Sequence, residues 1–201
     1  MTDEMIWNEV ERTLDIEAKS VEALRRTLDM ESIINTVRVI AACKGKTILS
    51  ACGTSGMAAR KIAHSLCCIE RPALFLAPAD AVHGALGVLQ KEDILILISK
   101  GGNTSELTKL IPACKTKGAT LIGVSENERS AIAKEADIFI KVKVETEPCR
   151  FNMLATASTM AVIAVFDAIC IALMQLTGYT KEQFAVIHPS GAVGDRLLGY
   201  K

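Results

Sequence analysis

The sequence of 201 residues has few aromatic side chains, 4% of the total, and no net charge, because 23 acidic residues balance 23 basic ones. A chain without a net positive field has nothing to draw nucleic acid or an anionic membrane towards it. We therefore expect neither as a partner. Half of the residues are hydrophobic, which is enough to bury a core without disulfides and excludes disorder.

The sequence also lacks any CxxC spacing among its seven cysteines, so it offers neither a zinc-ligand pair nor a redox motif. We expect reduced thiols, no metal and no cofactor. The acidic first 20 residues lack the basic start and apolar centre of an export signal. These features predict a cytoplasmic protein that folds as a single domain over residues 1–201, with N-terminal helices in 1–45, a core in 46–150 and a long helix with a C-terminal segment in 151–201.

No apolar run is long enough for a membrane span, which needs about 20 residues. The longest, Phe151 to Phe166, has 16 uncharged residues and includes several polar ones. We interpret it as part of a buried helix over residues 152–177 that is apolar on nearly every face. Such a helix needs cover on all sides. A sheet covers one side, and a second subunit is the simplest cover for the rest, so we expect a homo-oligomer, either a dimer or a tetramer.

Short apolar segments alternate with helical ones along residues 46–142. Predicted strands lie at 46–52, 73–76, 93–98, 119–124 and 137–142, and amphipathic segments at 2–28 and 32–42 precede them. Strands that are apolar on both faces and alternate with helices indicate a parallel sheet covered on both sides. The expected fold is therefore an α/β, three-layer αβα sandwich with a five-stranded parallel sheet. Ligands of such sheets bind beyond the carboxyl ends of the strands.

Small and hydroxyl-bearing residues follow two of these strands. The first turn contains Gly53, Thr54 and Ser55, and the second contains Ser99, Lys100, Gly101, Gly102, Asn103 and Thr104. The start of a helix favours an anion through free N–H groups and the helix dipole, so two converging turns predict a phosphate site. Neither turn has the Gly-Lys-Ser/Thr ending of a Walker loop. A tight turn with a helix cap is an equally good interpretation of each turn taken alone.

Four segments in this order resemble the sugar isomerase (SIS) family, which binds phosphosugars on a five-stranded sandwich. They are residues 53–56, 81–87, 99–106 and 184–194, and the resemblance covers nearly the whole chain. The last segment, together with Glu147-Pro-Cys149, is similar to the arabinose-5-phosphate isomerase branch. That resemblance implies a cofactor-free enzyme that interconverts D-ribulose 5-phosphate and D-arabinose 5-phosphate on the way to a lipopolysaccharide or capsule sugar.

The resemblance also implies a set of active-site residues. Glu147 would move the proton between C1 and C2, His188 would act as acid and base in ring opening, Glu106 would orient hydroxyls, and His83 would assist at an oxygen. Two simpler interpretations stay open. Glu147 also fits a solvated charge run over residues 143–147, and Glu106 also fits an acid that complements a helix dipole. By the same resemblance the phosphate would be held by Ser55, Ser99 and Thr104.

The chain departs from that branch at several pocket positions. Thr54 replaces a lysine, Ala85 an acidic residue, Gly101 a serine and Asn103 a glutamate. A charge-assisted hydrogen bond contributes about 1.5–3 kcal/mol, so loss of the lysine alone would cost about tenfold to a hundredfold in affinity or rate. Lys100 stands where the branch more often has asparagine, and we predict that it returns a positive charge to the pocket.

Three functions therefore remain open: an arabinose-5-phosphate isomerase, an isomerase of a different sugar phosphate, and a phosphosugar sensor without catalysis. Retention of Glu106, Glu147 and His188 favours an enzyme. Which subunit of an oligomer supplies His83 or His188 is open as well. Many members of the branch continue into a pair of regulatory nucleotide-binding modules. Because this chain stops within a few residues of Gly194, we expect no such regulation.

Overall fold

Five parallel strands form one sheet in the computed structural model, which describes residues 1–190. The strands are β1 (Thr47–Ala51), β2 (Ala73–Phe75), β3 (Ile94–Ile98), β4 (Thr120–Ser125) and β5 (Ile138–Lys141). Their order across the sheet is β2-β1-β3-β4-β5. This order confirms the five-stranded parallel sheet, and it reverses between β1 and β3, the point at which doubly wound sheets bind ligands.

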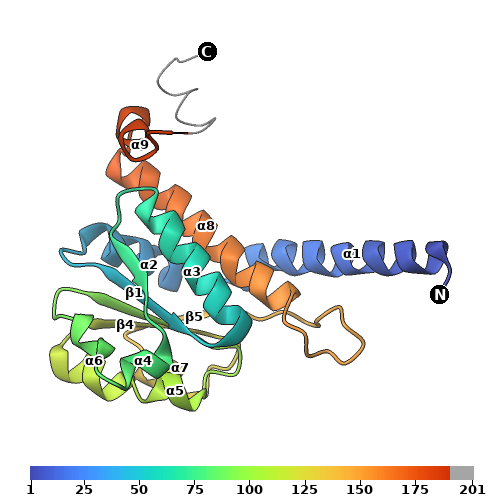
Figure 1. Cartoon of the computed structure of the whole chain (residues 1–201), viewed down its shortest axis with the longest axis horizontal. Helices are drawn as coiled ribbons and strands as arrows, with labels where there is room; N and C mark the ends of the chain where they lie inside the picture. The colour runs from blue at the N-terminus through green and yellow to red at the C-terminus, as the bar shows by residue number, and fades with distance from the viewer. Residues whose placement is uncertain (191–201) are drawn as a thin grey trace.

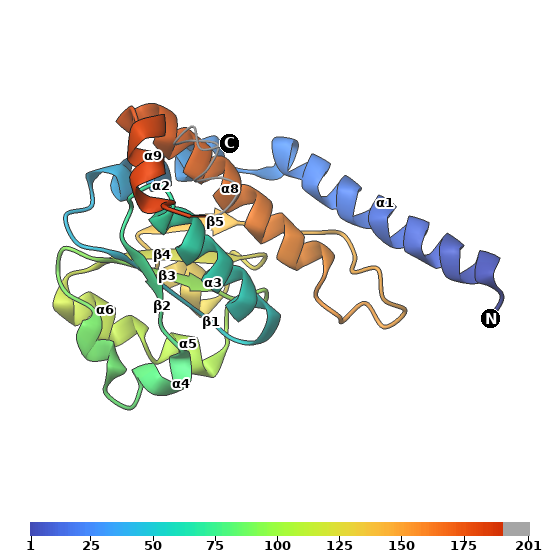
Figure 2. The ribbon, with the colours of Figure 1, turned by 45° about the horizontal axis from the view of Figure 1, so that its top comes forward.

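Helices cover both faces of the sheet, which confirms the three-layer sandwich (Figures 1 and 2). One layer consists of α1 (Asp3–Thr27), α2 (Met30–Ala42), α3 (Gly53–Cys67) and α8 (Ala157–Thr177). The other consists of α4 (Pro78–Ala81), α5 (Ser105–Thr108), α6 (Ile111–Lys117) and α7 (Ala131–Glu135). A 3₁₀ turn, η1 (Ala85–Val88), follows α4, and α9 (Lys181–Ile187) follows α8.

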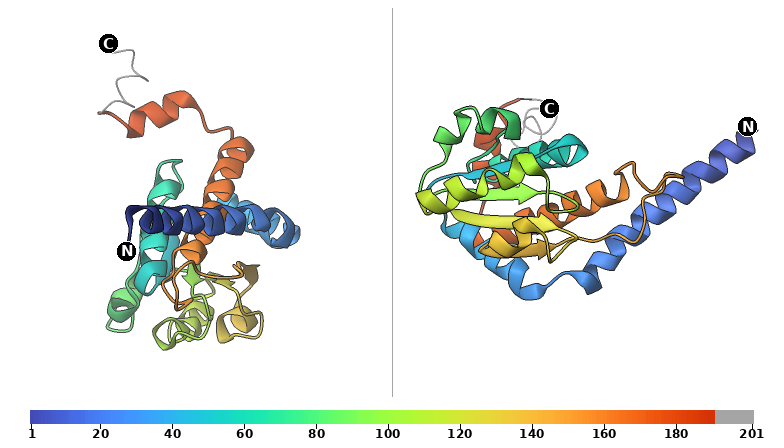
Figure 3. Two further views of the ribbon diagram at one scale, coloured as in Figure 1. Left: turned by 90° about the vertical axis from the view of Figure 1, so that its right-hand side faces the viewer. Right: turned by 90° about the horizontal axis from the view of Figure 1, so that it is seen from below.

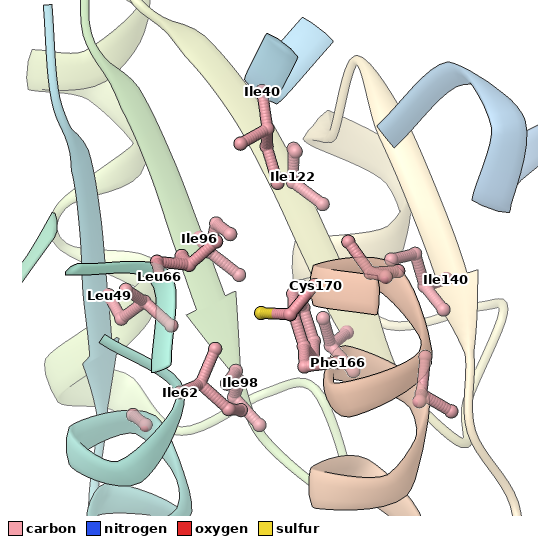
Figure 4. Packing of buried hydrophobic residues seen from close by; sticks show 14 of the residues in the cluster. Ile40, Leu49, Ile62, Leu66, Ile96, Ile98, Ile122, Ile140, Phe166 and Cys170 are labelled. Atoms are coloured by element: carbon pink, nitrogen blue, oxygen red, sulfur yellow. The ribbon is translucent and has the colours of Figure 1, made fainter. Parts of the chain in front are cut away.

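The alternation of side chains along β3 divides the core into two clusters. Ile94, Ile96 and Ile98 face the layer that contains α3 and α8, whereas Leu95 and Leu97 face the layer of short helices. Figure 4 shows the first cluster, where side chains of α3 and α8 meet those of the strands. Both faces of β3 are thus buried, as the apolar run predicted.

The helix predicted over residues 152–177 begins five residues later, at Ala157. Asn152 has a left-handed backbone with φ +55°, which a helix does not allow, and residues 152–156 form a loop instead. By length and composition α8 is able to cross a membrane, the one such helix among residues 1–190, although a core helix of a soluble protein has the same properties. Here α8 packs on α1, α2 and α3, its opposite face exposes Met160 and Ile171, and Leu176 is exposed near its C-terminal end.

The single helix expected after the second turn is two short ones, α5 and α6. Pro112 lies at the start of α6 and has no N–H to donate to a carbonyl in the preceding turn, so a continuous helix cannot form there.

The N-terminal half of α1 projects beyond the sandwich (Figure 3). It exposes the apolar side chains Ile6, Trp7, Val10 and Leu14. Near its middle, Arg12 donates a hydrogen bond to the carbonyl oxygen of Pro148, in the loop that follows β5. This contact connects α1 to the segment that carries Glu147.

Candidate active site

The two predicted turns lie side by side at the carboxyl edge of the sheet. β1 and β3 are paired in parallel, with Ala51 opposite Ile98. The chain therefore leaves both strands at the same level, into α3 on one side and into the loop 99–104 on the other. Gly53 opens α3 with φ +57°, a backbone conformation that favours glycine. This arrangement brings the start of α3 and the second turn to the switch point.

The loop after β3 is held by its own hydroxyl groups. The oxygens of Ser99 and Thr104 are 2.8 Å apart, and the N–H of Gly102 donates to the Ser99 hydroxyl at 3.1 Å. Gly102 has φ +69°, and a Cβ atom there would lie 2.2 Å from the hydroxyl oxygen of Ser130. Only glycine fits this position, because any side chain would collide with Ser130.

A hollow lies between this loop and the first turns of α3 and α8. Its polar lining consists of Ser55, Ser99, Lys100, Ser125, Ser158 and Thr159. Its apolar lining consists of Ala58, Ile98, Val124, Val142 and Val162. The start of each of the two long helices faces it, and a helix start attracts anions. The polar side of the hollow therefore favours an anionic group.

Ser125, Ser158 and Thr159 line this hollow but were not predicted from the sequence. Ser125 ends β4, and nothing in its local pattern marks it. A signal was available for the other two, because the hydroxyl-rich segment 156–159 stands at the beginning of an apolar run, where residues that cap helix starts are common.

Glu147 is buried beside the start of α8, with no side-chain exposure. Its Oε2 accepts hydrogen bonds from the backbone N–H groups of Thr156 at 3.0 Å and Ser158 at 3.3 Å. Its Oε1 accepts one from the ammonium of Lys100 at 2.7 Å. Burial acts to raise the pKa of Glu147, but Lys100 and the donors of Ser158 and Thr156 outweigh it, so the pKa lies below its ordinary value. Glu147 is thus an ionised, buried carboxylate and not part of a solvated charge run.

Lys100 lies on the wall of the hollow, with its side chain 40% exposed. Its backbone is fixed, because its carbonyl oxygen accepts from the Ser125 hydroxyl at 2.9 Å and from the N–H of Glu126 at 3.0 Å. Its ammonium is paired with Glu147, and its role toward a bound sugar phosphate stays a prediction.

Glu106 and His83 lie on exposed segments outside the lining of the hollow. Glu106 is in the first turn of α5, where its own backbone N–H and the Ser105 hydroxyl lower the pKa of its carboxyl group. Burial, with a smaller contribution from Glu106, raises the pKa of the Cys52 thiol that precedes α3. His83 lies in the turn after α4, and α4 packs on α5.

The remaining residues predicted to bind phosphate, Thr54, Gly101 and Asn103, do not line the hollow. Thr54 and Gly101 are exposed, and no atom lies within 4 Å of a Cβ placed at Gly101. The side-chain oxygen of Asn103 accepts a hydrogen bond from the N–H of Ala131 at 2.8 Å, at the start of α7. Asn103 therefore supports α7, and its side-chain carbonyl is already engaged.

His188 lies at the opposite end of α8 from Glu147. Its ring stacks on Phe184, with centroids 3.9 Å apart, and its Nδ1 is 2.9 Å from the carbonyl oxygen of Phe184. Gln183 holds α9 to Glu70, just beyond the end of α3, with a bond of 3.1 Å. The 21 residues of α8 span roughly 30 Å. Within one chain the structure does not bring His188 and Glu147 together, and residues 191–194 of the same motif lie outside the described residues.

Within residues 1–190, no three His, Cys, Asp or Glu side chains gather in a way that could hold a metal ion. The charged groups described at the hollow are Lys100, which lines it, and Glu147, which is paired with Lys100.

A comparison of the sequence with protein-family models agrees with this fold. A model of the SIS domain matches residues 40–172, which include the whole sheet, both turns and most of α8. The chain belongs to the SIS domain family.

Particular relatives share most of the sequence or the fold. The chain is 35% identical over 188 residues to the arabinose 5-phosphate isomerase KdsD of Pseudomonas aeruginosa, covering 94% of this chain and 57% of that protein. Arabinose 5-phosphate isomerase KpsF of Escherichia coli CFT073 is 36% identical, with 98% and 60% covered. The chain thus spans less than two thirds of the length of these relatives.

Solved structures superimpose closely. A proposed sugar-phosphate isomerase from Listeria monocytogenes has a TM-score of 0.94 and 62% identity, covering 94% of this chain and 100% of that one. The protein c3406 of Escherichia coli CFT073, in complex with arabinose 5-phosphate, has a TM-score of 0.90 and 30% identity, again covering 94% and 100%.

Proposed function

We propose that the protein is an aldose–ketose isomerase of sugar phosphates, and that its substrate pair is D-arabinose 5-phosphate and D-ribulose 5-phosphate. One observation carries the proposal: a buried carboxylate, Glu147, is ion-paired at 2.7 Å with Lys100, which lines the hollow beside Ser99 at the switch point of the sheet. The relatives named arabinose 5-phosphate isomerase and the sugar-phosphate complex of c3406 support the choice of substrate.

The phosphate is held by the start of α3 and by the loop after β3. Ser55 lines the hollow from α3, while Ser99 and Thr104 contribute hydroxyl groups from the loop. Hydroxyl groups next to the free N–H groups at the start of a helix are suited to bind a phosphate dianion.

Glu147 moves the proton. Its carboxylate takes the proton from C2 of the open-chain aldose, and the electron pair of that C–H bond forms the C1=C2 bond of an enediolate. The proton on Glu147, which can exchange with solvent, is then delivered to C1, while the hydroxyl proton of O2 passes to O1 and the ketose carbonyl forms at C2.

The histidine for ring opening comes from a second copy of the chain. His188 is at the far end of α8 from Glu147 in its own subunit, and the outward face of α8 exposes Met160 and Ile171. An apolar helix face of this kind requires cover. A homo-oligomer that buries it can bring His188 of one subunit to Glu147 of the next.

Deuterium exchange tests this function. D-arabinose 5-phosphate and a panel of other aldose and ketose phosphates are incubated with the protein in deuterated water, and NMR follows product and exchange at C1 and C2. We expect exchange that Glu147→Gln abolishes and that Glu145→Gln, at an exposed position two residues away, leaves intact. Exchange with a different sugar phosphate only would keep the isomerase and replace the proposed substrate with that sugar. Binding of every sugar without exchange indicates a sensor and refutes the isomerase.

A further inference from the structure

The two oxygens of Glu147 have different kinds of partners. Oε2 accepts from two backbone N–H groups of the segment 156–158, which are fixed by the start of α8. Oε1 accepts from the ammonium of Lys100 at 2.7 Å. Because the backbone donors cannot leave without unwinding the helix, Oε1 is the oxygen that can become free to accept a proton.

Lys100 is the movable partner of this pair. Its backbone carbonyl is fixed by Ser125 and Glu126, but its side chain is a flexible four-carbon stem that is 40% exposed. Among residues 1–190 it is the one charged side chain that forms an ion pair with Glu147. Arg12, from α1, reaches the same loop at the carbonyl oxygen of Pro148 and not at the carboxylate.

A second anion in the hollow competes for that ammonium. Lys100 follows Ser99 directly, and both line the hollow that contains the hydroxyl donors. A phosphate dianion bound there carries twice the charge of the carboxylate and attracts the ammonium more strongly at equal distance. The hollow before binding is close to neutral, since the charges of Lys100 and Glu147 cancel.

We propose that Lys100 couples phosphate binding to the proton-accepting power of Glu147: its ammonium blocks Oε1 in the free protein, and the bound dianion draws it away and releases that oxygen. This inference rests on the proposed function, in which Glu147 is the base. Lys100 then selects for phosphorylated sugars, because an unphosphorylated sugar meets a base that is still blocked.

The ionisation of Glu147 follows the same coupling. In the free protein burial raises its pKa, and the Lys100 ion pair with the donors of Ser158 and Thr156 lowers it further than burial raises it. When the Lys100 ammonium leaves, the backbone donors of Thr156 and Ser158 remain but the positive charge beside Glu147 is gone. The pKa of Glu147 then rises, and the carboxylate becomes a better base. A base is most effective when its pKa approaches the working pH.

The test is an NMR titration of the Glu147 carboxyl carbon in protein labelled with ¹³C-glutamate, with Glu147→Gln identifying the resonance. The titration is recorded without anion, with sulfate, which stays a dianion over the whole range, and with D-arabinose 5-phosphate. We expect the midpoint to move to higher pH with either anion. In Lys100→Met the midpoint is expected to be higher from the start and to respond little to anion. Lys141→Met removes a lysine that pairs with Glu128 outside the hollow and is expected to behave as the wild type.

Activity provides the second measurement. We expect Lys100→Met to lose about tenfold or more in kcat/KM for the sugar phosphate, the cost of a lost charge-assisted bond. We also expect phosphite dianion to accelerate exchange of unphosphorylated D-arabinose in the wild type but not in this variant.

An unchanged Glu147 midpoint in the wild type with both anions overturns the coupling, whatever the activity. A midpoint that moves in a protein that isomerises no sugar refutes the proposed function and leaves the coupling standing.

Discussion

Lys100 and Glu147 form an ion pair of 2.7 Å although 47 residues separate them. The pair joins the loop after β3 to the loop that precedes α8, and its Lys100 lines the hollow at the switch point of the sheet. The two segments most closely associated with the proposed chemistry are therefore connected directly.

Gly102 is expected to tolerate no side chain. In Gly102→Ala the new Cβ would lie 2.2 Å from the hydroxyl oxygen and 2.5 Å from the Cβ of Ser130, and the backbone is left-handed. These effects together predict a loss of about 2–4 kcal/mol in the free energy of unfolding, measured with urea. Gly101→Ala, at the adjacent position with open space, is the matched control and is expected to change little. Equal effects at the two positions would contradict the described turn.

Asp93 is expected to link stability to pH. Burial raises its pKa, but the Lys46 side chain and the backbone N–H groups of Lys46 and Gln90 lower it further, to below its ordinary value of 3.8. A carboxyl group whose pKa is lowered in the folded protein stabilises the fold fully at pH values above its ordinary pKa. This contribution is lost as the pH falls through the pKa of the folded protein.

The variant Asp93→Asn isolates this contribution. We expect it to lose about 2–3 kcal/mol at neutral pH, where Lys46 is left without its partner. The difference from the wild type should shrink as the pH falls below 3.8, as followed by urea unfolding at several pH values. Asp3→Asn, at the exposed start of α1, is the control. A difference that is constant with pH would show that the ionised form of Asp93 is not what stabilises the fold.

Asn152 is expected to position Glu147. Its side-chain oxygen accepts the N–H of Glu147 at 2.7 Å and the hydroxyl of Thr146 at 3.1 Å. Both Asn152→Ala and Asn152→Gly remove this acceptor and are expected to lower kcat by about tenfold. The alanine variant should lose more stability than the glycine variant, because φ is +55° and glycine adopts that conformation freely. Full activity in Asn152→Gly would mean that the hydrogen bond does not position the base.

Mixed subunits are expected to reveal a shared site. Glu147→Gln and His188→Ala are each expected to be inactive alone. When the two variants are unfolded, mixed and refolded together, some sites combine an intact Glu147 from one chain with an intact His188 from another. We expect activity to return in the mixture. If it stays at the level of the separate variants while mixed oligomers are present, the histidine is not contributed by a neighbouring subunit.

Much of the fold could be predicted from the sequence because its signals are local. Each strand is an apolar run, and the order of strands and helices leads directly to a parallel sheet whose turns meet at one edge. The local signals failed where a single residue changes the backbone. Pro112 divides one expected helix into two, and the left-handed Asn152 delays the start of α8.

The candidate site was less predictable, because its contacts join distant segments. Glu147 stands in a charge run by sequence, and only the tertiary structure shows that α8 and Lys100 surround it. Asn103 illustrates the opposite case, since a residue of the predicted phosphate turn supports α7 instead. The position of His188 depends on how α9 packs, and no local pattern contains that information.

A crystal structure of Glu147→Gln with D-arabinose 5-phosphate tests the central claim most directly. We expect the phosphate within hydrogen-bond distance of the Ser55, Ser99 and Thr104 hydroxyl groups, with C1 and C2 of the sugar about 3–3.5 Å from the side chain at position 147. A sugar phosphate bound outside the hollow, or bound there with C1 and C2 turned away from position 147, would contradict the account.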